Sequence, residues 1–197
     1  MFESAWDFFE TWGKSASALS SDLVGAAAAS YMQHVSNPLI INPTIVTLVD
    51  YRIKSTEPRM WVLSLFQLAP LFFTRVAHGV NSGPAYGAGR KEKMSNNVGS
   101  HQSCLGGFAT LNARKAKAGQ KRDAENNRSR ALAMRIEGLD AGVNDKAKRR
   151  GILFHGAHYV NNKNAGRSYG CLATAQSVNN KIIPLIKDGT FFFAYCG

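Results

Sequence analysis

Short apolar runs separated by turn-forming residues dominate the chain after Pro43. They are rich in β-branched and aromatic residues, and stretches dense in Gly, Ser, Asn and Pro lie between several of them. This pattern is typical of β-strands joined by turns. We therefore predict a mainly β (α+β) body whose strands lie within residues 44–52, 59–66, 71–79, 102–110, 131–139, 151–156 and 190–196.

Helical patterns lie on either side of this body. Residues 20–35 open on Ser and Asp, which cap helices, continue through good helix formers and stop before Asn37-Pro38. Residues 174–189 are amphipathic, with Pro184 inside the helix and Gly189 at its expected C-terminal cap. The predicted organisation is an N-terminal helical segment over residues 1–42 and one domain over residues 43–197.

Two polar stretches interrupt the strands. Residues 80–100 are dense in Gly, Ser and Asn and predict a long loop, which in a compact domain is usually functional or mobile. Residues 112–130 are basic and predict a solvated hairpin or loop. The alternative is a contact surface for an anionic polymer, which would make the protein a non-catalytic binding module; the residues concerned are Arg114, Lys115, Lys117, Lys121 and Arg122.

The chain has 197 residues and a formal net charge of +11. Such an excess favours polyanionic partners, including nucleic acid, anionic lipid and acidic cell-wall polymers. The basic residues are not interleaved with aromatic residues for base stacking and no nucleic-acid-binding motif is present, so nucleic acid is not expected. The apolar stretch 60–73 is too short to cross a bilayer, and Ser64, Gln67 and Pro70 interrupt it.

The first residues carry aromatic side chains in a helical pattern, without the basic and apolar regions of a secretory signal peptide. These aromatic side chains would either pack on the body or dock on a partner or membrane surface. They are Phe2, Trp6, Phe8, Phe9 and Trp12.

One of the three cysteines lies close to a histidine in the sequence. Cys171 ends the stretch HGAHYVNNKNAGRSYGC, which His155 opens, whereas Cys104 and Cys196 lie in apolar strands and are expected to pack. A thiol becomes a nucleophile when a base takes its proton, and a helix N-terminus directly after Cys171 would lower its pKa and supply oxyanion donors. A zinc site built from these residues with His158 and His78 lacks a convincing fourth ligand, so no metal is predicted.

This stretch resembles a known signature. His155-Gly156 followed by Ser168, Gly170 and Cys171 is similar to the H-G … S/T-x-G-C pattern of the L,D-transpeptidase catalytic domain family (YkuD-like). The blocks TIVTLVDYRIKSTEPRMWVLSL, FTRVAHGVNSG, MSNNVGSHQSCLG and IIPLIKDGTFFFAY extend the resemblance, to the murein L,D-transpeptidase subgroup, over roughly residues 43–196. It implies a β-sandwich or half-open barrel with N-terminal helices and one late helix after the cysteine.

The resemblance also implies a site and a reaction. Cys171 would attack an L-to-D amide of a peptidoglycan stem peptide, His155 would be its base, the N–H groups of Gly170 and Cys171 would bind the oxyanion, and Ser168 would fix the turn. D-alanine would leave, and a neighbouring stem would form a 3–3 cross-link; hydrolysis by an L,D-carboxypeptidase or endopeptidase is the alternative. This reaction would need no metal or organic cofactor. The expected substrate-side residues are Tyr169, Arg167, Gly156, His78, Gln102 and His158, with His158 in a supporting position.

Two residues depart from the pattern. Ala173 replaces an arginine common in the wider superfamily, and Leu172 replaces a proline common in the subgroup, which leaves substrate preference open. Arg167 is the expected substitute for the missing charge. Action in the periplasm or cell wall without a signal peptide would fit a trimmed form of the protein, or a phage virion or lysis protein.

Overall fold

The computed structural model describes residues 19–84, 93–115 and 132–197. The N-terminal aromatic residues and most of the basic stretch 112–130 therefore lie outside the described residues. Of the basic side chains named above, Arg114 and Lys115 are described, and both are exposed at the end of a strand.

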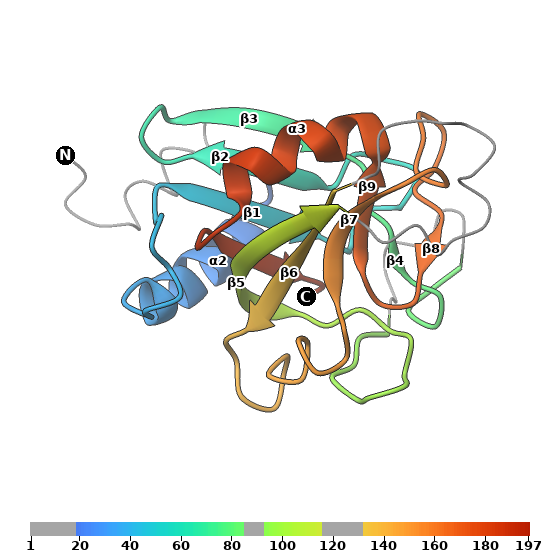
Figure 1. The fold of residues 1–197 in the computed structure, drawn as a ribbon, viewed down its shortest axis with the longest axis horizontal. Coiled ribbons are helices and arrows are strands. Elements are labelled where there is room, and N and C mark those ends of the chain that lie inside the picture. Colours follow the sequence, from blue (N-terminus) through green and yellow to red (C-terminus); the bar gives the residue numbers. More distant parts are fainter. Residues whose placement is uncertain (1–18, 85–92, 116–131) are drawn as a thin grey trace.

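An eight-stranded sheet forms the body of the protein (Figure 1). Its strand order is β3-β2-β1-β10-β5-β6-β7-β9, and the sheet curls into a nearly closed barrel. The mainly β prediction is confirmed. The strands are β1 (Ile45–Asp50), β2 (Met60–Ser64), β3 (Ala69–Thr74), β5 (Gly106–Lys115), β6 (Leu132–Gly138), β7 (Leu153–Ala157), β9 (Leu172–Ala175) and β10 (Phe191–Tyr195).

Alternate side chains of strand β10 pack into two separate hydrophobic clusters, one on each face of the sheet. Phe192 and Ala194 face a cluster that includes Phe108 of β5 and Phe154 of β7, whereas Phe191 and Phe193 face the opposite side. Successive side chains of a strand point to opposite faces, so a strand that is apolar throughout must be covered on both. Each face of the sheet is accordingly covered by a helix.

Helix α2 (Ser21–His34) covers one face and helix α3 (Gln176–Ile186) packs into the other. The predicted cap is present, because the Ser20 hydroxyl accepts the Leu23 N–H at 3.3 Å. Figure 1 shows α3 running across the strands. Pro184 lies inside this helix. No helix in the described ranges is long and apolar enough to cross a membrane.

A second, two-stranded parallel sheet lies beside β9. It joins β4 (His78–Gly79) to β8 (Arg167–Ser168), which are side by side in Figure 1. Directly before β4, the Ala77 N–H donates to the Ala173 carbonyl at 2.8 Å. This contact joins the small sheet to the edge of the large one.

A buried amide holds the loop that leads into β7. The Asn144 side chain is fully buried, donates to the carbonyls of Leu105 and Gly107 at 2.8 Å each, and accepts the Asp140 N–H at 2.9 Å. Asp140 also contacts His34 of α2, with 2.6 Å between Oδ1 and Nε2. The loop before β7 is thereby joined to β5 and to α2.

We expect Gly138→Ala to destabilise the fold by about 3 kcal/mol, because the new methyl would displace Asn144. An ideal Cβ at Gly138 would lie 2.0 Å from the Asn144 carbonyl oxygen. Gly142→Ala in the same loop is the matched control; its Cβ meets nothing within 4 Å, and its positive φ of +76° costs about 1 kcal/mol. Urea unfolding measures both, and equal losses would contradict the account.

Candidate active site

Strands β7 and β9 bring His155 and Cys171 to the same face of the sheet. The two strands are parallel, with His155 opposite Ala173 and Phe154 opposite Leu172. Phe154 and Leu172 point into the core, so alternation turns His155 and Ala173 to the other face, together with Cys171 two residues earlier. Strand spacing and rise place the two Cα atoms about 8 Å apart.

A backbone bond orients the His155 imidazole. Its Nδ1 lies 3.0 Å from the Gly156 carbonyl oxygen. A carbonyl oxygen accepts but does not donate, so Nδ1 carries the proton and Nε2 is left as the basic nitrogen. Burial lowers the pKa of His155 below its ordinary value, which keeps the imidazole neutral.

The Cys171 thiol points toward the start of β7. It donates to the Gly151 carbonyl with 3.9 Å between sulfur and oxygen. Burial raises the pKa of Cys171, while a hydrogen bond from the Leu153 N–H and the charge of Arg150 act in the opposite direction. No hydrogen bond joins this thiol to the imidazole, both groups being in the described part of the chain.

Ser168 builds the turn that carries Cys171. Its hydroxyl donates to the Cys171 carbonyl at 2.6 Å and accepts the Gly170 N–H at 3.1 Å. Gly170 has φ +110°, and a Cβ there would lie 2.8 Å from the Gln102 carbonyl oxygen, so glycine is required. The Gly170 N–H is therefore already used inside the turn and is not available as an oxyanion donor.

The late helix forms as predicted, but it does not begin directly after Cys171. Strand β9 lies between them, and α3 begins at Gln176. Four strand residues span about 13 Å, and the field of a helix terminus falls off within its first turn. Helix α3 therefore neither lowers the pKa of Cys171 nor supplies N–H groups beside its sulfur.

The predicted substrate-side residues lie at different depths around the turn. Tyr169 is exposed, with its ring 4.9 Å from that of His101, and Arg167 is exposed on β8. Gln102 is half-buried and donates from Nε2 to the Asn81 carbonyl at 3.0 Å. Contact with substrate stays a prediction for all three.

His78 lies inside the protein, where its partner is a residue that sequence analysis missed. Arg59 is fully buried, and its Nη2 donates to His78 Nδ1 at 2.8 Å. The other guanidinium nitrogens donate to the carbonyls of Val76 and Ile53. Burial, followed by the Arg59 charge, lowers the pKa of His78 to about 4, so this histidine is neutral. Because His78 is itself part of β4, this hydrogen bond anchors β4 to the buried Arg59.

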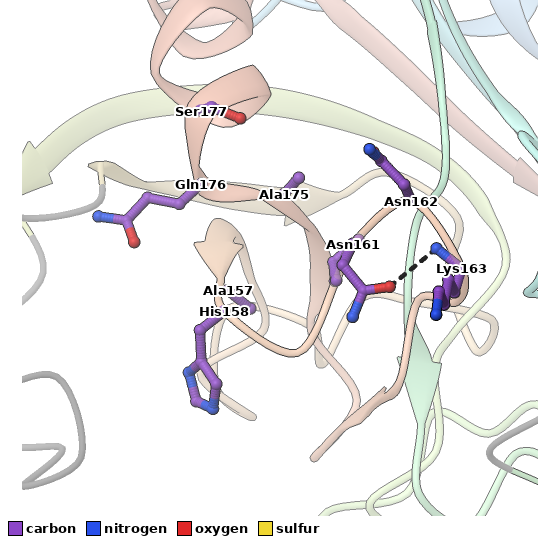
Figure 2. Close-up of a pocket in the computed structure, with 9 residues that line it drawn as sticks. Ala157, His158, Asn161, Asn162, Lys163, Ala175, Gln176 and Ser177 are labelled. Carbon is purple, nitrogen blue, oxygen red and sulfur yellow. Dashed lines mark hydrogen bonds between the residues drawn. The ribbon is translucent and has the colours of Figure 1, made fainter. Parts of the chain in front are cut away.

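His158 lines an open pocket of about 540 Å³ at the ends of β7 and β9. Figure 2 shows His158 and Gln176 on one side of this pocket and Lys163 on the other, with the Asn161 side chain accepting the Lys163 N–H at 2.8 Å. Ala173, which replaces an arginine common in the wider superfamily, is fully buried and packs with Ala77.

The three cysteines are free. Within the described residues, no group of three or more His, Cys, Asp or Glu side chains is arranged to hold a metal ion. The described groups at this site include one thiol, one neutral imidazole and the backbone of the Ser168–Cys171 turn.

The sequence model of a family described as "L,D-transpeptidase catalytic domain" matches residues 15–195. Comparison with curated protein sequences gives no match.

Solved structures with a similar chain fold include three bacterial proteins. An L,D-transpeptidase from Mycobacterium smegmatis is 12% identical, with 77% of this chain and 58% of that chain covered and a TM-score of 0.44. A mutant of the Enterococcus faecium L,D-transpeptidase is 15% identical, with coverage of 80% and 51% and a TM-score of 0.47. A mutant of the helical cell shape determining protein from Campylobacter jejuni is 12% identical, with coverage of 83% and 52% and a TM-score of 0.48. This chain thus spans less than two thirds of the length of each.

Proposed function

The chain belongs to the L,D-transpeptidase catalytic domain family, and on that basis we propose that it is a cysteine-dependent acyltransferase of peptidoglycan stem peptides. The bond attacked is the amide between the L-centre of the third stem residue and the terminal D-alanine. The observation that carries this proposal is the shared face of β7 and β9, where a thiol and a neutral imidazole with a free Nε2 come together.

His155 acts as the general base. Rotation about the Cα–Cβ bond of Cys171 turns its sulfur from Gly151 toward the Nε2 of His155, and hydrogen bonds of this kind often tighten only when substrate is bound. Nε2 takes the thiol proton as sulfur attacks the carbonyl carbon. The same nitrogen then gives the proton to the leaving amine of D-alanine, and a thioester remains on Cys171.

The oxyanion is bound by the backbone of the turn. Because the Gly170 N–H donates to Ser168, the donors we assign are the N–H groups of Cys171 and Tyr169. Ser168 holds both ends of this turn and keeps the donors in place before substrate arrives. Preorganised donors of this type contribute more than flexible ones because they need no rearrangement during the reaction.

The acceptor decides the product. An amine from a neighbouring stem gives a 3–3 cross-link, whereas water gives a tripeptide and makes the enzyme an L,D-carboxypeptidase. The substrate assigns the site of action to the periplasm or cell wall. The net charge of +11 supports binding to a polymer whose stems end in carboxylates.

Mass spectrometry of a purified disaccharide-tetrapeptide incubated with the protein tests the proposal. We expect loss of the terminal D-alanine and a transient acyl adduct on the peptide that contains Cys171. A cross-linked dimer identifies a transpeptidase, and a tripeptide monomer identifies a hydrolase. An intact tetrapeptide with no adduct on Cys171, over a range of acceptors and pH, would count against the proposed activity.

A further inference from the structure

The Arg150 side chain bridges the start of β7 and the loop of residues 95–102. Its Nη1 donates to the Ser95 carbonyl at 2.5 Å. Its Nη2 donates to the Ser100 hydroxyl at 3.1 Å and to the Gln102 carbonyl at 2.5 Å. An ideal Cβ at Gly170 would lie 3.4 Å from the same Nη2. The guanidinium is therefore held between the loop and the residue that precedes Cys171.

The oxygens that accept hydrogen bonds from Arg150 carry no charge, and the guanidinium also interacts with the Cys104 thiol, whose pKa it acts to lower. Within the described ranges, no carboxylate lies at ion-pair distance from its guanidinium. These hydrogen bonds fix the planar group without cancelling its charge, because carbonyl and hydroxyl oxygens carry no formal charge. A fixed positive charge thus stands beside the turn of the nucleophile.

The residues that follow Arg150 hold the sulfur itself. The Cys171 thiol donates to the Gly151 carbonyl, and the Leu153 N–H donates to the sulfur. The backbone also holds this short segment, because the Gly151 N–H donates to the Lys148 carbonyl and the Ile152 N–H to the Ala147 carbonyl, each at 3.0 Å. The Arg150 side chain adds the anchor that ties the segment to the 95–102 loop.

We propose that Arg150 is a positioning residue for the nucleophile: it locks the start of β7 to the 95–102 loop and holds its positive charge beside the Gly170 turn. The inference rests on the proposed role of Cys171.

The ionisable groups around the sulfur agree with this assignment. Arg150 acts to lower the pKa of Cys171, against the effect of burial. The Cys104 thiol and the Tyr159 hydroxyl also interact with this sulfur: a negative charge on Cys171 raises the pKa of both groups. His155, on the neighbouring strand, is neutral, since burial lowers its pKa. Among these ionisable side chains around the Cys171 sulfur, Arg150 is therefore the one that carries a positive charge.

Alkylation of Cys171 by iodoacetamide as a function of pH tests the proposal without any turnover. The rate, followed by mass spectrometry of the peptide that contains Cys171, reports the thiolate fraction. We expect Arg150→Gln to slow alkylation at pH 8 by about tenfold, because losing the neighbouring positive charge raises the pKa of Cys171 and lowers the thiolate fraction. Arg149→Gln makes the same charge change at the exposed neighbouring residue, and its profile should match the wild type.

Arg150→Lys keeps the charge but has one nitrogen for three acceptors, so we expect a rate between those of Arg150→Gln and the wild type. If Arg150→Gln does not fold, as judged by thermal unfolding, the lysine variant alone decides. If every folded Arg150 variant were alkylated at Cys171 at the wild-type rate, the inference would be overturned. A wild-type protein that is alkylated as expected but leaves the tetrapeptide intact would overturn the proposed activity and leave the Arg150 inference standing.

Discussion

Replacing Cys171 by alanine is expected to abolish D-alanine release, with a loss in kcat/KM of at least about a thousandfold. In the proposed mechanism the thioester forms on its sulfur, and no second thiol in the described part of the chain lies on this face of β7 and β9. The change removes one atom from a partly buried position, so the fold should persist. The check is release of D-alanine from the disaccharide-tetrapeptide, measured by mass spectrometry.

The other two cysteines provide matched controls for this variant. Cys104 is buried in the core, and its pKa is raised to about 11, chiefly by burial, which keeps it a protonated thiol. Cys196 follows β10 at the far end of the chain. Cys104→Ala and Cys196→Ala should both retain activity. Full activity in Cys171→Ala, or its loss in Cys196→Ala, would contradict the assignment of the nucleophile.

The sequence pattern correctly predicted those helices and strands whose structural signals lie within their own residues. The apolar run of β10 and the cap of α2 at Ser20 carry strong local signals, and both elements formed as predicted. Strand β9 was missed because its sequence, LATA, is alanine-rich and continues smoothly into a helical pattern. It is a strand because it pairs with β7, a contact between segments that sequence periodicity does not connect.

At the site, too, the residues marked by a local motif were predicted, whereas a residue held by distant contacts was not. The motif predicted His155, Ser168 and Cys171 as a group because they lie in one short stretch. Arg150 was missed because its partners, Ser95 and Gln102, lie in a distant loop and a lone arginine gives no sign of them.

His155→Gln is expected to lower kcat/KM by about 10²- to 10⁴-fold, the usual contribution of a general base. Glutamine keeps much of the size and polarity of histidine but accepts no proton near neutral pH. Turnover of the disaccharide-tetrapeptide measures the loss. The same variant also separates two mechanisms, a base that acts during attack and a thiolate–imidazolium pair that exists before substrate binds.

The pKa directions favour the first of these mechanisms and set the pH dependence. Burial lowers the pKa of His155 from its ordinary 6.5 and raises that of Cys171 from its ordinary 9.0, so the free enzyme holds a neutral imidazole and a protonated thiol. Since the base must be neutral, activity should fall as the pH drops through a value below 6.5.

Alkylation by iodoacetamide should be slow in acid and still rise above pH 9.0. His155→Gln should leave that alkylation profile unchanged, because a neutral imidazole adds no charge beside the thiol. Rapid alkylation below pH 6.5 that disappears in His155→Gln would instead establish the preformed ion pair.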